Sequence, residues 1–213
     1  MSGWDPNQMR RITFLDGIPD NQVRTLAAQT SFHARKSAQR QLCSVPELAY
    51  RLDTGSRVTT TFSSDLCRAL RNRCAESNIH RREVGGILVG YSQTTSRLFH
   101  RHYQLLMTDV VPVESRDSSS THVAFDRNAW LKIEREIDMT YGPEGKRRLG
   151  WYHTHPVQGI FFSPQDREVH SIFKKPFELA IVVDPKTMEA GLYYWRNYRE
   201  KSLAGPLRFP LPV

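Results

Sequence analysis

The stretch from residue 153 to residue 166 constrains the fold more than any other part of the chain. It reads His-Thr-His-Pro-Val-Gln-Gly-Ile-Phe-Phe-Ser-Pro-Gln-Asp. Residues two apart on a strand point to the same face of a sheet, so the imidazoles of His153 and His155 can bind one metal ion. Ser163 and Pro164 are a typical helix N-cap and first-turn proline, which predict a helix that holds Asp166 in its first turn. The chain must therefore bring the end of a strand and the start of a helix together.

This motif provides the ligand set of a catalytic zinc site. Two neutral imidazoles and one carboxylate give Zn²⁺ three ligands and leave a fourth position for water, whereas a structural site is closed by four protein ligands. Each half of the motif is weak by itself, because Ser-x-x-Asp is also an ordinary helix cap. His-x-His occurs again at His100 and His102, with no following proline and no acid at a matching distance. The conjunction of both halves favours a metal site.

The flanking segments predict a mixture of strands and helices, which fits an α/β or an α+β class. Alternating or β-branched runs predict strands over 58–62, 84–90, 97–111, 149–155, 178–183 and 191–195. Helices are expected after Ser63, after Asp126 and after Ser163, the last ending near Phe173. In the first of these helices, the residues that share one face are Leu66, Cys67, Leu70 and Cys74.

The two ends of the chain are less regular than its middle. We expect residues 1–57 to form an N-terminal extension, within which 46–52 is a connection closed by a turn at 53–56. Residues 58–200 would be the main domain, and 201–213 a Pro-rich C-terminal tail. The extension carries apolar residues too numerous for a pure linker, so we expect it to dock on the core or on a partner.

Composition and charge exclude several classes of protein. The 213-residue chain is 39% hydrophobic and 24% charged, which excludes wholesale disorder, and it has no apolar run near the ~18 residues of a membrane span. No signal peptide is apparent and the three cysteines form no Cys-x-x-Cys pair, so we expect a cytoplasmic protein with no membrane association. The net charge of +8 is spread along the chain, which makes nucleic acid an unlikely partner.

Together with Glu83, which precedes Val84-Gly-Gly, the motif resembles that of the JAMM (MPN+) zinc metalloprotease family: a distant glutamate, His-Ser/Thr-His-Pro, then Ser-x-x-Asp. The resemblance covers about residues 58 to 198. It implies an α/β, cytidine-deaminase-like MPN (JAB) fold with a central mixed sheet flanked by helices. It also implies one Zn²⁺ per chain on His153, His155 and Asp166, with Glu83 as general base and then acid and Ser163 as a hydrogen-bond donor to the oxyanion.

The resemblance also implies a substrate class. Family members with all five positions commonly cleave after the C-terminal glycine of ubiquitin or a ubiquitin-like protein, in precursor processing or deconjugation. The compact chain resembles a stand-alone prokaryotic-type member, which can accompany E1- or E2-like enzymes, including in antiphage systems. We expect the extension to help select the substrate and the polar loop 114–121 to clamp its tail. The candidate contacts there are Ser118, Ser119, Ser120, Thr121 and His122.

Three other interpretations stay open at this stage. The RadC group, which is associated with nucleic acid, shares the His-x-His…Asp skeleton but typically reads His-Asn-His-Pro-Ser-Gly where this chain has His-Thr-His-Pro-Val-Gln. An inactive MPN scaffold is a second alternative, although such members usually lack metal ligands. A peptidase that trims sulfur-carrier-like proteins is a third. His170, one helical turn after Asp166, is expected either to support the ligands or to be exposed.

Overall fold

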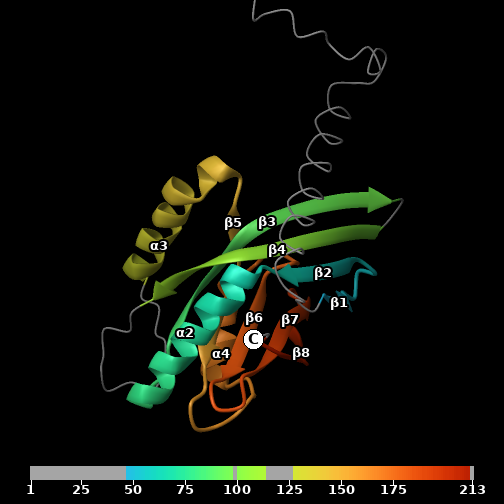
Figure 1. Cartoon of the computed structure of the whole chain (residues 1–213). Helices are drawn as coiled ribbons and strands as arrows, with labels where there is room; N and C mark the ends of the chain where they lie inside the picture. Colours follow the sequence, from blue (N-terminus) through green and yellow to red (C-terminus); the bar gives the residue numbers. More distant parts are fainter. Residues whose placement is uncertain (1–46, 98–99, 114–126, 212–213) are drawn as a thin grey trace, which may run out of the picture.

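A computed structural model describes residues 47–97, 100–113 and 127–211 (Figure 1). In these ranges eight strands form one sheet with the order β1-β2-β4-β3-β5-β6-β7-β8. The strands are β1 (Leu48–Arg51), β2 (Arg57–Phe62), β3 (Gly85–Arg97), β4 (His100–Val113), β5 (Arg147–Thr154), β6 (Leu179–Asp184), β7 (Glu189–Asn197) and β8 (Ser202–Pro210). The loop 114–121 lies outside the described residues, as does most of the extension.

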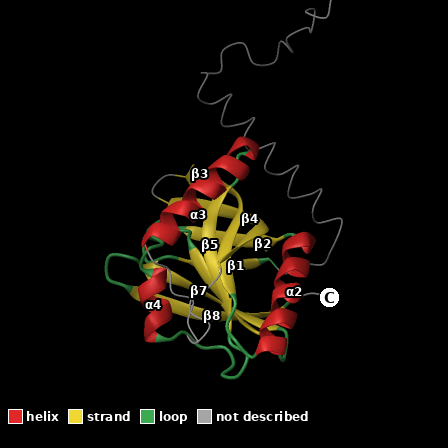
Figure 2. Ribbon diagram, turned by 90° about the vertical axis from the view of Figure 1, so that its left-hand side faces the viewer, coloured by secondary structure: helices red, strands yellow, loops and turns green. Residues whose placement is uncertain are grey.

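The sheet is mixed. The pairs β2–β4 and β5–β6 are parallel, and all the other neighbours run antiparallel. Parallel neighbours require a crossover connection, which for β5 and β6 contains the helix α4 (Pro164–His170). Helices lie on both faces of the sheet (Figure 2). This arrangement confirms the expected α/β class with a central mixed sheet flanked by helices.

One face of the sheet is covered by α2 (Ser64–His80). Its N-cap is Ser63, whose side-chain oxygen accepts a hydrogen bond from the Leu66 amide at 3.1 Å, as predicted. The predicted apolar face is buried and packs on the sheet: Leu66, Cys67, Leu70 and Cys74. This packing holds α2 against the sheet, and a short connection leads from its end at His80 to the start of β3 at Gly85.

The opposite face of the sheet carries α3 (Arg127–Thr140) and α4 (Figure 2), with the short 3₁₀ helix η1 (Gly142–Glu144) after α3. Ile133 and Ile137 of α3 pack in a second apolar cluster that also contains Trp151 of β5. Helix α4 ends earlier than expected, at His170, but Phe173 is still buried in this cluster. The second cluster therefore packs against β5 at Trp151, two residues before the first histidine of the His-x-His segment.

The sheet extends beyond the expected domain range of 58–200 at both ends. The prediction that 46–52 is a connection was wrong, because Leu48–Arg51 pairs with β2 and the Tyr50 ring stacks on Tyr194 with centroids 3.9 Å apart. The expected turn at 53–56 follows it. The tail expected from residue 201 contains β8, which pairs with β7. As an edge strand, β8 tolerates its prolines because one row of its backbone groups needs no partner strand.

The Gly-Gly segment at the start of β3 permits the close approach that its sequence predicts. A Cβ atom at Gly86 would lie only 2.4 Å from the carbonyl oxygen of Val111 on β4. On the other side, β3 pairs with β5 so that Gly85 lies opposite His153. This register brings the residues just before β3 next to the end of β5.

No helix among the described residues is both long and apolar enough to cross a membrane.

Candidate active site

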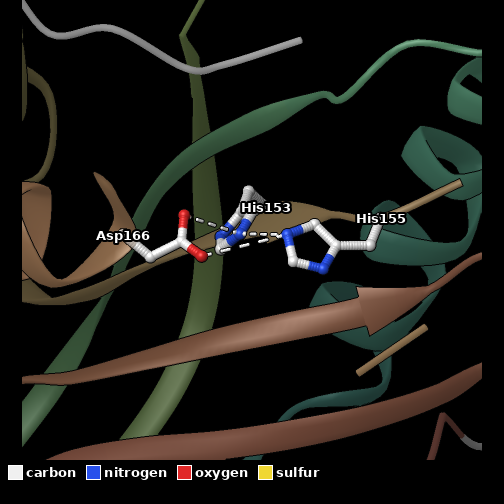
Figure 3. A group of neighbouring side chains, drawn as sticks. All are labelled: His153, His155 and Asp166. Atoms are coloured by element: carbon white, nitrogen blue, oxygen red, sulfur yellow. Dashed lines mark hydrogen bonds and ion pairs between the residues drawn. The ribbon is translucent and has the colours of Figure 1, made fainter. Parts of the chain in front are cut away.

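The end of β5 and the start of α4 bring three buried side chains together: His153, His155 and Asp166 (Figure 3). His155 directly follows β5, and its amide still donates to the Val183 carbonyl at 2.9 Å, so the strand geometry continues through both histidines. Their Nε2 atoms are 2.9 Å apart. The Asp166 carboxylate lies 3.1 Å from Nε2 of His153 and 3.9 Å from Nε2 of His155. The three side chains thus converge on one point.

A capping box holds the Asp166 carboxylate in place. Ser163 Oγ accepts a hydrogen bond from the Asp166 amide at 3.1 Å, and Asp166 Oδ2 accepts one from the Ser163 amide at 2.7 Å. Pro164 occupies the first turn, where its missing N–H costs nothing. With Oδ2 fixed by the backbone, Oδ1 is directed at His153.

The hydrogen bonds of His155 determine which ring nitrogen carries a proton. Its Nδ1 lies 2.9 Å from the Gly159 carbonyl oxygen, and a carbonyl can only accept, so Nδ1 is protonated in the neutral ring. Burial and then the neighbouring charge of His153 lower the pKa of His155 to about 4. At neutral pH the ring is therefore uncharged, and its Nε2 lone pair points into the cluster.

The Asp166 carboxylate is ionised despite its burial. Burial alone raises the pKa of this group, but the hydrogen bond and charge of His153, together with the hydrogen bonds of Ser163, lower its pKa to about 2. The cluster therefore offers one negative oxygen ligand and two imidazole nitrogens.

This donor set fits a bound Zn²⁺. Imidazole Nε2 and carboxylate oxygen are common zinc ligands, and three of them leave one open position. The two Nε2 atoms are so close that at most one proton can lie between them, and a cation bound by both lone pairs could replace it. The buried Nδ1 of His153 has no hydrogen-bond partner among the described residues. Within those residues this is the one group of three or more His, Cys, Asp or Glu side chains close enough to share an ion. At the other His-x-His, His102 instead pairs with the hydroxyl of Thr59 at 3.0 Å.

Glu83 and Ser163 line the same cleft as the three convergent side chains. The cleft has a volume of about 150 Å³. Glu83 precedes β3, and its Oε1 lies 3.7 Å from Nε2 of His155 with 15% of the side chain exposed. Ser163 Oγ accepts from the Asp166 amide, which leaves its own O–H free to donate toward the cleft. All five motif residues of the sequence therefore meet in one place.

An aromatic contact beside the cleft was not predicted from the sequence, and the position of His170 was left open. Phe161 packs on the His155 ring with centroids 4.5 Å apart, and Val157 in the same loop is 70% exposed. In the sequence, the large apolar residues between His155 and Ser163 could have indicated this contact. His170 is fully buried and accepts a hydrogen bond from Trp151 Nε1 at 3.2 Å. The candidate substrate contacts Ser118–His122 lie outside the described residues.

Comparison with known proteins agrees with this geometry. Residues 64–178, more than half of the chain, match the family model described as JAB1/Mov34/MPN/PAD-1 ubiquitin protease. The chain belongs to this family. The resemblance to JAMM (MPN+) proteases read from the motif is therefore confirmed.

Individual relatives match over parts of their length. COP9 signalosome complex subunit 5 of Eremothecium gossypii is 35% identical over 112 residues, which cover 51% of this chain and 24% of that protein. The STAM-binding protein-like protein of Xenopus laevis is 35% identical over 72 residues, 33% of this chain and 17% of that one. AMSH-like protease of Mus musculus is 28% identical over 138 residues, 64% and 28% of the two chains. The chain thus spans roughly a quarter or less of the first relatives it matches.

Proposed function

We propose that this protein is a zinc-dependent peptidase or isopeptidase that cleaves after the C-terminal glycine of ubiquitin or a ubiquitin-like protein, in precursor processing or deconjugation. The observation that carries the proposal is the convergence of Glu83, Ser163 and the three-ligand cluster in one cleft of a ubiquitin-protease family domain. His153, His155 and Asp166 would hold one Zn²⁺ per chain.

The residues around the cluster have distinct chemical tasks in this proposal. Zinc, when bound, supplies a water of lowered pKa and polarises the scissile carbonyl. Glu83 accepts the proton of the attacking water and passes it to the leaving amine, as general base and then general acid. The O–H of Ser163 donates a hydrogen bond to the oxyanion that develops on the carbonyl.

No covalent intermediate is required, because the nucleophile is water. The two described cysteines, Cys67 and Cys74, are buried in α2, which covers the face of the sheet opposite to α4. They therefore have no part in the reaction. Cysteines outside any disulfide are also compatible with the cytoplasmic location that we propose for this protein.

The substrate assignment rests on the family and on its named relatives. Residues 64–178 match a family model described as a ubiquitin protease. The relatives named AMSH-like protease and COP9 signalosome complex subunit 5 share the domain. On the same basis we propose that ubiquitin-like conjugates are the partners, with E1- or E2-like enzymes in a bacterial ubiquitination-like or antiphage system. Sulfur-carrier-like proteins remain the alternative substrates within the peptidase class.

The test compares wild type with Glu83→Gln on fusions that end in ubiquitin, a bacterial ubiquitin-like protein or a sulfur-carrier-like protein. We expect about one zinc per chain in both proteins, because Glu83 is assigned to the water and not to the metal. Turnover by Glu83→Gln should fall at least ~100-fold, as expected for loss of a general base. The matched control Glu189→Gln, at a glutamate on β7 that is half exposed, should keep wild-type turnover. Wild-type rates in Glu83→Gln would refute the assigned role.

A further inference from the structure

The residues on either side of Glu83 are joined by two buried hydroxyl groups. We propose that Thr154 and Ser77 are positioning residues, which hold Glu83 at the metal cluster through a closed series of hydrogen bonds. The catalytic part of this inference rests on the function proposed above, whereas its structural part does not.

Thr154 lies between the two histidines of the cluster but faces the other side of the sheet. Side chains alternate along a strand, so the rings of His153 and His155 point into the cleft while Thr154 points toward α2. There its Oγ1 lies 2.8 Å from Oγ of Ser77, near the C-terminal end of that helix. Both side chains are fully buried.

The direction of each hydrogen bond follows from its neighbours. Ser77 Oγ donates to the Arg82 carbonyl oxygen at 2.7 Å, since a carbonyl can only accept. With that proton committed, Ser77 Oγ accepts the proton of the Thr154 hydroxyl at 2.8 Å, since the other acceptor near that hydroxyl, the Val84 carbonyl oxygen, lies farther away at 3.4 Å. Thr154 Oγ1 in turn accepts from the Val84 amide at 3.0 Å. The series therefore begins at the amide that follows Glu83 and ends at the carbonyl that precedes it.

This closed series fixes the backbone of Glu83 from both sides. The Thr154 amide adds a backbone hydrogen bond to the Val84 carbonyl at 2.9 Å, which joins the same segment to β5. The segment is otherwise a short connection between α2 and β3, begun by Arg81 in a left-handed conformation. The connection belongs to no helix or strand, so its backbone has no regular hydrogen-bond pattern. The hydroxyl groups of Thr154 and Ser77 hold it in place with side-chain hydrogen bonds instead.

The position of the Glu83 carboxylate depends on this support. A proton acceptor must lie within hydrogen-bond reach of the atom that it deprotonates, and displacement by ~1 Å can cost ~100-fold in rate. Valine has the shape of threonine without its hydroxyl. Thr154→Val would leave the buried Val84 amide unpaired and would remove the proton that Ser77 accepts, while leaving the ligand side chains unchanged.

The experiment combines kinetics with a readout that does not depend on activity. Thr154→Val, Thr154→Ser, Ser77→Ala and wild type are compared by kcat and KM on the cleaved fusion, by zinc content, and by hydrogen exchange of the Val84 amide. Thr61→Val is the matched control, since Thr61 is an equally buried threonine of the same sheet whose hydroxyl has no partner among the described residues. Thermal unfolding verifies that every variant is folded.

We expect Thr154→Val to lower kcat by ~10- to 100-fold with KM changed less than ~3-fold, because positioning of the base and not substrate affinity is lost. Zinc should stay near one per chain, and Val84 should exchange ~10-fold faster, as expected when one buried hydrogen bond is lost. Thr154→Ser should restore both values, Ser77→Ala should resemble Thr154→Val, and Thr61→Val should resemble wild type.

Three results would overturn the inference: unchanged exchange of Val84 in Thr154→Val, an equal loss of kcat in Thr61→Val, or loss of zinc in Thr154→Val with kcat falling in proportion. If wild type cleaves none of the fusions, the proposed function fails. In that case the exchange of Val84 in the same variants still decides whether the hydroxyl groups hold the Glu83 segment.

Discussion

At His155 and Asp166 the structure sets the protonation state of two candidate metal ligands. The Gly159 carbonyl selects the tautomer of His155, and His153 together with the capping box keeps Asp166 charged. A metal ion therefore meets groups that need not lose a proton at neutral pH, which favours binding. His153 lacks such a support among the described residues, and its ring is held by stacking on Trp151 with centroids 4.7 Å apart.

Removal of any one ligand should therefore release the metal. We expect purified wild type to contain about one zinc per chain, and His153→Ala or Asp166→Ala to lose most of it, because a three-ligand site cannot spare one. Elemental analysis after dialysis measures this. His102→Ala, which removes a histidine from the other His-x-His, should keep its zinc. Unchanged zinc in both ligand variants would show that the metal binds elsewhere.

Buried His170 should make the fold sensitive to acid. Burial and then the charge of Arg167 lower the pKa of His170 to about 3, below the value of about 6.5 expected in the unfolded chain. The unfolded state then binds a proton that the folded state does not, so stability is lost as pH falls from about 6.5 toward 3. The loss from one such group approaches ~1.4 kcal/mol per pH unit.

The measurement is urea unfolding of metal-free protein between pH 7 and pH 4.5. The free energy of unfolding of wild type should fall more steeply than that of His170→Gln, whose amide oxygen can still accept from Trp151. His155 also has a lowered pKa and adds a loss of the same sign, but it is common to both proteins. Parallel curves would show that His170 titrates normally.

Among the elements, β1 shows where a sequence pattern is too short to be recognised. Tyr50 is the one buried residue of this four-residue strand. A single buried position gives no alternation of apolar and polar residues, so the sequence did not indicate a strand here. The strand is nevertheless part of the core, through the stacking of Tyr50 on Tyr194. A protein that begins at residue 58, the expected domain boundary, would lack this contact.

Tyr50→Ala should accordingly destabilise the whole domain. We expect a loss of about 3 kcal/mol in the free energy of unfolding, the range for removing a buried aromatic side chain. Arg51→Ala on the same strand is the control, because an exposed side chain usually contributes within ~0.5 kcal/mol. Equal stability of the two variants would show that β1 belongs to an extension rather than to the core.

Sequence could predict the elements whose signals are local. Ser63 and Ser163 mark helix starts through their own side chains, and the His-x-His spacing indicates a shared face by geometry alone. The hydroxyl series through Ser77 and Thr154 joins residues 77 positions apart, so no spacing could predict it. The burial of His170 likewise depends on Trp151 of a neighbouring strand. Contacts of this kind join residues that are distant in sequence and form only in the folded sheet, so they could not be predicted from the sequence.

At the scale of the whole molecule, one buried ion pair joins separate elements. Arg148 of β5 donates through Nε to Glu178 at 2.9 Å, and the other oxygen of Glu178 accepts from the Lys175 amide at 2.9 Å. Arg148 also pairs with Glu134 of α3, and its guanidinium lies over the Phe173 ring. The side chain of Glu178 is completely buried. Arg148 and Glu178 together therefore link β5, α3 and the segment that leads into β6.

Glu178→Ala should cost about 3 kcal/mol, because it removes the buried partner of Arg148 and leaves that charge only the partly exposed Glu134. The matched control is Glu189→Ala, whose pair with Arg208 is more than half exposed and should contribute below ~1 kcal/mol. Urea unfolding of the two variants gives the comparison. A loss at Glu178 as small as that at Glu189 would show that the ion pair is not needed to hold these elements together.

The sheet divides into two sets of strands that are each continuous in sequence. Strands β1 to β4 come from residues 48–113 and β5 to β8 from residues 147–210, and the described sets pair with each other at β3–β5. The candidate zinc ligands lie on β5, on the residue after it and on α4, which all fall within the range of the second set, whereas Glu83 directly precedes β3 of the first set. Under the proposed function, a molecule damaged at this pairing would retain its metal and still be unable to turn over substrate. A measurement of zinc content would therefore not distinguish such molecules from active ones. The fraction of active molecules in a preparation would have to be measured by titration of active sites.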